Sequence, residues 1–375
     1  MTNESIAGAF TWLCFKKEIN KMKIKIISYF VVLTFMLSGC YDNKENPVLF
    51  SHNDFHNTKE LKGECIEVPT ELSPDEMYVV RDSLVLICNT NPSIKKKIGL
   101  YNLKDWKLLG EYAERGHSND EFIDCSVILK GNSNEFFLKD IQKSQFWICD
   151  FDSLAKNRPC AKRWFSYSRN VIDVYPLDST YIGYNFWYLN DEKYDNNVSA
   201  IAEYPMREDI REVSKNKYKY FVANVTGGVV FRNPENHDIW VAYRHDNIIE
   251  IYDSLLNLQK TMKGPNYRKN KYVTQEMSNQ EIVSFTDKSY TSCYTGGYVT
   301  NNHVYLIYEN HTCDIFPQRP LPVEILMFDW DGNCLCNYRL DKFAYAISID
   351  SKEEIMYATC CDENNGEIQL IKYSL

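Results

Sequence analysis

Two short stretches contain residue types that could do chemistry, and neither has the spacing that the chemistry needs. Residues 116–120 (Gly-His-Ser-Asn-Asp) have the composition of a turn that presents a nucleophilic serine, but Asp replaces the final Gly and no strand-to-helix turn is predicted there. Residues 329–333 (Asp-Trp-Asp-Gly-Asn) have the composition of a calcium loop, but the Gly comes too early and Leu340 occupies the position of the bidentate acid. We therefore predict no catalytic residue, and we expect 329–333 to form a hairpin turn.

Histidine and cysteine are not spaced for a metal site either. The seven His are scattered, and no Cys-x-x-Cys pair occurs among the thirteen Cys. Most of the Cys lie in strand-like runs, where a thiol fills apolar space, although one or two disulfides remain an alternative in an oxidising compartment. We predict no metal and no cofactor, and Asp124, Asp173 and Asp350 are generic candidates for acids near a central axis.

The first forty residues are organised like a bacterial export signal. Basic side chains at 21–25 precede an apolar run at 26–37, which is too short to cross a bilayer and suits the core of a signal peptide. Residues 37–40 (Leu-Ser-Gly-Cys) resemble a lipobox, at which signal peptidase II cuts and the thiol of Cys40 receives a lipid. We therefore expect a lipoprotein of the bacterial cell envelope, on the periplasmic or the surface-facing side of the outer membrane.

The charge of the remaining chain limits its partners. Residues 1–39 hold five of the 42 Lys and Arg and two of the 51 Asp and Glu, which leaves 37 basic and 49 acidic side chains and a formal charge near −12. No basic stripe or arginine cluster stands out against this acidic balance. We therefore expect no nucleic-acid partner.

Strand-like runs recur with a fixed period after residue 60. Each run is short, rich in β-branched or aromatic residues, and closed by Asp, Gly, Asn or Ser-Lys, which favours strands joined by tight turns. Asp331-Gly332 is the strongest hairpin signal, because both central positions favour positive φ. The third run of each group ends near position 101, 151, 203, 252, 328 or 371, a spacing of roughly 43–52 residues with one longer interval, typical of propeller blades. We predict an all-β fold, a six-bladed β-propeller of four-stranded antiparallel blades.

The same pattern predicts the organisation of the chain. A signal peptide at 1–39, with 1–21 an over-extended start or a long n-region, precedes a polar tether at 40–60 and the propeller at 61–375. The last group of runs has only three strands, so we expect residues 65–68 to supply its fourth strand and close the ring. The third blade is expected from strands at 171–175, 181–187 and 199–203 with a weak fourth near 218–221, and residues 264–288 are expected to be a polar insertion.

Three features together resemble the TolB-like six-bladed β-propeller lipoproteins. They are the loop from Gly116 to Glu121 and Phe122, the turn at 328–333, and the lipobox. The resemblance covers about 60–375, and the loop departs from the family pattern where Ser118 and Asn119 replace a Gly and a Pro. It implies an envelope-anchored binding or scaffold module, more consistent with a non-enzyme than with an enzyme. The alternative is a propeller enzyme of the metal-assisted hydrolase or lactonase type, with an axial site. A third hypothesis is a sensor or assembly subunit.

Four Asp-Ser pairs have a second interpretation besides turn formation. Asp-Ser begins β-turns through side-chain to backbone hydrogen bonds, and Asp-Ser followed by Leu or Thr resembles the acceptor signal of a bacterial O-glycosylation system. The acceptors would be Ser83, Ser153, Ser179 and Ser254.

Strand order predicts which face of the propeller binds a ligand. Turns that join first to second and third to fourth strands lie on one face, the short-turn face, whereas the other connections lie on the long-loop face. Long irregular loops on a rigid frame usually carry binding residues, so we expect an envelope protein or a saccharide or peptide ligand on the long-loop face. The expected contacts are Arg115, His117, Tyr267, Arg268, His311, Phe316 and Arg319.

Overall fold

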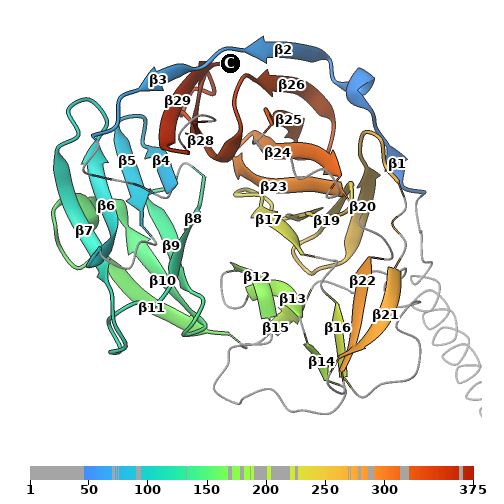
Figure 1. The fold of residues 1–375 in the computed structure, drawn as a ribbon, viewed down its shortest axis with the longest axis horizontal. Helices are drawn as coiled ribbons and strands as arrows, with labels where there is room; N and C mark the ends of the chain where they lie inside the picture. Colours follow the sequence, from blue (N-terminus) through green and yellow to red (C-terminus); the bar gives the residue numbers. More distant parts are fainter. Residues whose placement is uncertain are drawn as a thin grey trace, which may run out of the picture. The chain divides into compact units, whose positions relative to one another are not determined.

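The computed structural model confirms that the protein is almost entirely β-structure (Figure 1). It describes residues 46–69, 72, 74, 76–89, 94–131, 133–167, 171–177, 181–185, 187–189, 201–203, 220–223, 227–268, 270, 272–277, 280–285, 291–312, 321–362 and 366–375. Residues from Pro47 to Leu375 form one compact unit. No helix within the described ranges is long and apolar enough to cross a membrane.

Five of the sheets contain four neighbouring antiparallel strands each, and these reproduce five of the expected blades. Sheet 1 contains β4 (Glu76–Val80), β5 (Leu84–Cys88), β6 (Lys96–Asn102) and β7 (Leu108–Glu114), and sheet 2 contains β8 (Cys125–Leu129), β9 (Glu135–Asp140), β10 (Gln145–Asp150) and β11 (Ala161–Ser166). Sheet 4 contains β17 (Gly228–Arg232), β18 (Ile239–Tyr243), β19 (Ile248–Tyr252) and β20 (Leu258–Lys263), and sheet 5 contains β23 (Thr291–Val299), β24 (His303–Thr312), β25 (Glu324–Asp329) and β26 (Cys334–Leu340). Sheet 6 contains β27 (Ala344–Ile349), β28 (Ile355–Cys361), β29 (Ile368–Ser374) and, from the other end of the chain, β3 (Glu64–Ile66).

The third blade differs from its expectation. Sheet 3 has three strands, β12 (Val171–Pro176), β13 (Tyr181–Asn185) and β15 (Ile201–Glu203), and β15 runs parallel to β13. The run expected at 181–187 ends as β13, and the chain continues into β14 (Trp187–Leu189), which pairs with β16 (Tyr220–Ala223) in a separate side sheet. The side sheet is completed by β21 (Tyr272–Met277) and β22 (Gln280–Phe285), so the expected polar insertion contains a hairpin. The fourth strand expected for blade three is therefore paired elsewhere.

Residues 47–61, of which 47–60 were expected within the tether, instead lie along the outer strands of two sheets. β1 (Val48–Leu49) runs parallel to β20, and β2 (Asn57–Leu61) runs parallel to β26 (Figure 1). A single 3-10 turn, η1 (His52–Asp54), separates them. We call residues 47–61 the strap. Phe50 and Phe55 fasten it, because both rings are buried and each lies 5.5 Å from the ring of Phe328.

Six buried apolar clusters hold the sheets together. Each cluster contains side chains from two sheets, and the sequence of clusters runs from sheet 1 through sheet 6 and back to sheet 1. Representative members are Leu86 and Phe136 (sheets 1 and 2), Phe146 and Tyr181 (2 and 3), Ile182 and Val241 (3 and 4), Trp240 and Phe328 (4 and 5), Ile325 and Ala358 (5 and 6), and Leu370 and Val85 (6 and 1). Because a middle strand is covered on both faces, it is apolar without alternation, as in β18. Nine of the ten described cysteines are buried, and none of the ten forms a disulfide.

Two turns differ in detail from their predictions. The turn between β25 and β26 is a hairpin, as expected, but of its residues only Gly332 has positive φ (+78°), and a register shift follows in the strands. A bulged turn therefore replaces the two-residue turn that Asp331-Gly332 suggested. Ser153 lies in a short helix, α2 (Phe151–Ala155), whose first turn is capped by the Asp150 carboxylate. Its Asp-Ser pair is therefore helical and does not form a β-turn.

Candidate functional site

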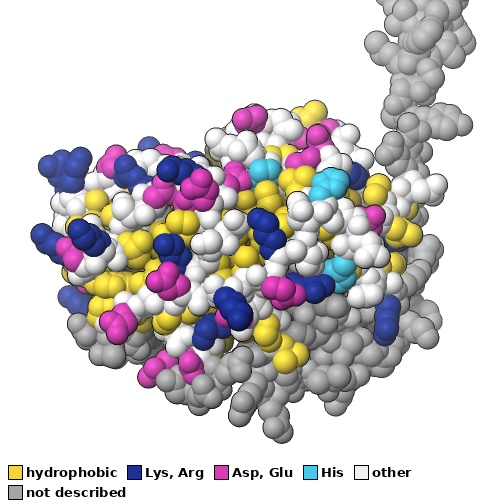
Figure 2. Space-filling model, turned by 90° about the horizontal axis from the view of Figure 1, so that it is seen from above, with side chains coloured by type: hydrophobic (Ala, Val, Ile, Leu, Met, Phe, Trp, Pro, Cys, Tyr) yellow, Lys and Arg dark blue, Asp and Glu magenta, His cyan; other side chains and the backbone are white. Residues whose placement is uncertain are grey.

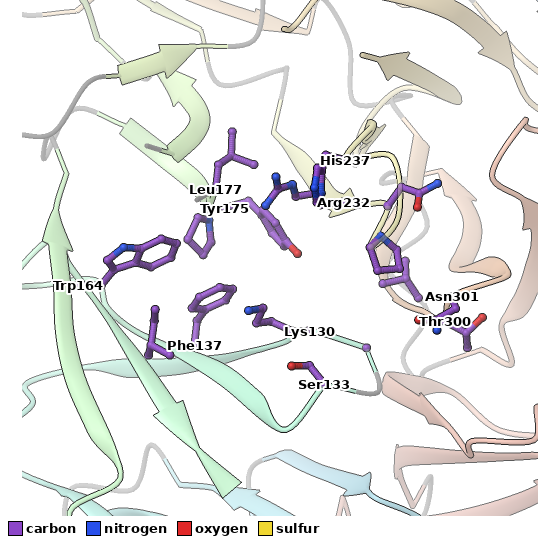
Figure 3. A pocket seen from close by; sticks show the side chains of 16 residues that line it. Lys130, Ser133, Phe137, Trp164, Tyr175, Leu177, Arg232, His237, Thr300 and Asn301 are labelled. Carbon is purple, nitrogen blue, oxygen red and sulfur yellow. The ribbon is translucent and has the colours of Figure 1, made fainter. Parts of the chain in front are cut away.

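A cavity of about 440 Å³ opens where the first strands of several sheets end (Figure 3). Its walls come from the turn after β8, the end of β12, the turn after β17 and the turn after β23. All of these turns join a first to a second strand, so the cavity lies on the short-turn face. We call it the short-turn pocket. Its volume falls within the roughly 300–1,000 Å³ of small-molecule sites, toward the lower end.

The turn between β17 and β18 places two basic side chains at the pocket. The Asn233 side chain accepts hydrogen bonds from the backbone of Glu235 (2.8 Å) and Asn236 (3.4 Å), and the Asn233 backbone nitrogen donates to the Asp238 carbonyl oxygen (2.8 Å). These bonds form a tight Asx-type turn. Arg232 lies at the start of this turn and His237 lies near its end, where the φ of His237 is positive (+67°). Both side chains line the pocket (Figure 3).

The turn between β8 and β9 forms the opposite wall and needs a glycine. Gly131 has positive φ (+57°), and a Cβ at this position would lie 2.7 Å from the carbonyl oxygen of Val299 at the end of β23. Only glycine satisfies both constraints. The turn can therefore touch sheet 5, and Lys130 is held beside the pocket with its ammonium 2.9 Å from the Glu135 carboxylate.

An aromatic surface forms the third wall. The rings of Phe137 and Trp164 are stacked, with centroids 5.2 Å apart and planes 12° apart, and the Lys130 ammonium lies 5.1 Å from the Phe137 ring centre. Phe137 is buried, whereas Trp164 is only partly buried and keeps an accessible surface. Tyr175 lies above them (Figure 3), and its burial, partly opposed by Arg232, raises the pKa of its hydroxyl to about 12. The hydroxyl is therefore protonated at neutral pH.

The pocket is basic on an acidic protein. Lys130, Arg232 and His237 line it, and no Asp, Glu or Cys is among its lining residues. Elsewhere, on the face seen in Figure 2, Lys and Arg side chains lie beside Asp and Glu side chains without a continuous field of one sign. No cluster of three metal-ligating side chains occurs within the described ranges. The arrangement can bind an anion and a flat or apolar ring together, and it offers no carboxylate base.

The five described residues among those expected to bind a ligand do not line this pocket. Arg115 and His117 are exposed on the loop after β7, and Arg268 is exposed after β20. Tyr267 lies under the ammonium of Lys263 at 4.7 Å, and His311 lies in β24. Phe316 and Arg319 lie outside the described residues. The long-loop site therefore stays a prediction.

The other expected sites have varied surroundings. Ser83 and Ser254 are exposed in turns, and Ser153 is partly buried in α2. Ser179 and Cys40 lie outside the described residues. Of the acids named as axial candidates, Asp350 caps a turn by accepting from the backbone of Glu354 (2.8 Å) and Ile355 (2.9 Å).

Sequence reasoning missed the pocket because it ranked loops by length. Lys130 and Arg232 flank short turns rich in Gly, Asn, Ser and Pro, a composition that by itself predicts only a turn. The available signal was a basic residue at the end of a first strand in two different blades. Trp164 carried no such signal, because an aromatic residue in a strand usually belongs to the core.

The comparisons with known proteins concern the whole fold. The profile of the family described as TolB-like 6-blade propeller-like matches residues 54–352. A DUF4221 family member from Bacteroides vulgatus has 9% identity and a TM-score of 0.46, with 84% of this chain and 96% of that chain covered. A protein of Bacteroides fragilis described as exported has 10% identity and a TM-score of 0.42, with 88% and 99% covered. No curated protein matches the sequence.

Proposed function

Because this chain belongs to the TolB-like six-blade propeller family, we propose that it is a binding protein of the bacterial cell envelope whose ligand site is the short-turn pocket. We infer that the propeller has six blades, with sheet 3 as the incomplete one, and that its ring is closed by the pairing of β3 with β29. The observation that carries the proposal is the pocket itself, in which basic and aromatic side chains converge on a rigid frame.

The frame supports binding because its pocket residues are held before any ligand arrives. Backbone hydrogen bonds fix the turn at Asn233, and close packing fixes the turn at Gly131. A ligand then pays little conformational entropy to order the site, which favours affinity. The alternative, a hydrolase with an axial acid, finds no support in this pocket, because its lining supplies no carboxylate.

The membrane anchor is the second part of the proposal, and it rests on the lipobox. The six residues between Cys40 and Pro47 would span at most about 25 Å when fully extended, so the propeller would stay close to the bilayer. The variant Cys40→Ala should release the protein from the membrane fraction or leave an uncleaved precursor. An unchanged distribution and mass would contradict lipidation at this residue.

Binding in the pocket is tested by thermal unfolding of the full chain against a library of sugars, sugar acids, amino acids and dipeptides. A compound at one hundred times its Kd stabilises the folded state by about 2.7 kcal/mol. The variant Asn301→Trp places an indole at the exposed rim of the pocket and should abolish that stabilisation. Lys352→Trp is the matched control, because Lys352 is exposed on the turn between β27 and β28 and does not line the pocket. If no compound stabilises the protein, or if Asn301→Trp responds like the wild type, the pocket is not the ligand site.

A further inference from the structure

We propose that the ligand of the short-turn pocket is an acidic saccharide of one or two rings, a sugar whose carboxylate is held by Lys130 and Arg232. This inference rests on the proposed function, because it names the chemistry of the same site. Three features of the pocket carry it: its charge, its aromatic wall and its polar rim.

The charge selects an anion. Lys130 and Arg232 face the pocket from different sheets, and no acidic side chain lines it (Figure 3). The carboxylate of Glu135 lies 2.9 Å from the Lys130 ammonium, and Glu135 is not a lining residue. A ligand carboxylate would complete a charge-assisted hydrogen-bond arrangement in a partly desolvated site, where such bonds are stronger than in water.

The aromatic wall selects a ring next to that anion. The partly exposed Trp164 is stacked on Phe137, and the Lys130 ammonium lies over the same Phe137 ring. A cation and an aromatic surface are therefore adjacent. A pyranose has an apolar face of C–H groups that packs on an indole, and in a uronic acid the carboxylate is attached to that same ring. One uronic acid ring can therefore contact the aromatic surface and the adjacent cation at the same time.

The rim can recognise hydroxyl groups. The side chains of His237 and Asn301 both line the pocket, and neither makes a hydrogen bond or ion pair within the described part of the chain. An imidazole and an amide each offer a donor and an acceptor, which suits sugar hydroxyls. A compact acidic amino acid or dipeptide would also supply the charge, but it would present fewer hydroxyl groups to this rim and no ring face to Trp164.

The test compares ligands that share one pyranose ring and differ at C6, where only the acid carries a charge. Isothermal titration of the full chain with glucuronic acid, its neutral methyl ester and glucose keeps the ring constant. We expect the acid to bind at least roughly tenfold more tightly than either neutral sugar, because a hydrogen bond to a charged group contributes about 1.5–3 kcal/mol. Lys130→Gln should bring the three affinities close together, whereas Trp164→Ala should weaken all three. Lys104→Gln, at an exposed turn of the same face, is the charge-matched control and should bind like the wild type.

The outcomes separate this inference from the proposed function. Equal affinity for the acid and its methyl ester would overturn the acidic class and leave the pocket as a sugar site. Another outcome is that no sugar acid binds, whereas a different library compound, such as an acidic dipeptide, binds to the wild type and not to Asn301→Trp. That outcome would refute the saccharide as the ligand class and leave the proposed binding function intact. If Lys104→Gln and Lys130→Gln lowered the affinity for glucuronic acid equally, the effect of charge would be non-specific. That result would overturn the assignment of Lys130 as the residue that holds the carboxylate. A wild type that binds nothing would overturn both.

Discussion

Replacing Gly63 by Val tests whether the pairing of β3 with β29 stabilises the whole unit. A Cβ at Gly63 would lie 2.1 Å from the Ile371 side chain and 2.8 Å from the Tyr373 ring. Both neighbours are fully buried in β29 and cannot move aside. The Gly63 nitrogen also donates to the Asp341 carboxylate at 3.2 Å, so any shift of β3 that relieves the contact also breaks this bond.

The expected cost follows from these contacts. Overpacking a well-packed site costs about 1–3 kcal/mol, and each lost hydrogen bond adds about 1 kcal/mol. We therefore expect Gly63→Val to lower the free energy of unfolding by about 2–4 kcal/mol and the melting temperature by roughly 5 °C. The assay is chemical and thermal unfolding followed by circular dichroism, with amide hydrogen exchange in residues 370–372, the positions of β29 that face β3.

Lys62→Val is the matched control, because Lys62 is the exposed neighbour of Gly63. A surface substitution of this kind changes stability by less than about 0.5 kcal/mol. If Gly63→Val were as stable as Lys62→Val and residues 370–372 stayed protected from exchange, β3 would not be a structural strand of sheet 6.

Two further predictions concern other contacts between distant segments. Burial alone would raise the pKa of Glu353, but hydrogen bonds from His303 and its neighbours outweigh it and hold that pKa below the usual 4.5. The stability that this carboxylate contributes is therefore present above its unfolded pKa, and it is lost as the pH falls below about 4.5. Glu353→Gln should lower stability at pH 7 and flatten its pH dependence in acid unfolding, and an unchanged acid profile would count against this linkage. Phe50→Ala should lower the free energy of unfolding in a urea titration by about 3 kcal/mol, because it removes the ring that packs the strap against Phe328. Leu49→Ala is the control: the Leu49 side chain is 72% exposed, so its loss should lower that free energy by less than about 0.5 kcal/mol.

Local patterns predicted the strands well but not always their partners. The runs of sheets 1, 2, 4, 5 and 6 were identifiable because each ends in a turn residue that also fixes the next strand as its antiparallel neighbour. Residues 201–203 come sixteen positions after the end of β13, and β15 runs parallel to β13. Residues 220–223 pair with β22, about sixty positions later. Pairings of that range depend on tertiary packing, which a local pattern does not contain.

The strap and the pocket escaped prediction for different physical reasons. Four of the five β2 side chains are exposed, so this edge strand needs no apolar alternation and has the composition of a tether. The pocket is built from the ends of strands in four sheets. Lys130 and Arg232 are about one hundred positions apart, and only the packing of the sheets against one another brings them to one cavity.

The pairings of the N-terminal strands have a consequence for the order in which the chain can fold. The backbone nitrogen of Gly63 binds the carboxylate of a residue 278 positions later, and β2 and β3 pair with β26 and β29 near the end of the chain. The first strands to be synthesised are therefore among the last to find their partners, and the entropy of closing so long a loop slows that step. A chain interrupted before β29 keeps β3 unpaired and exposes the edge of β28 to other chains. Sheet 6 therefore cannot be assembled until β29 has been synthesised.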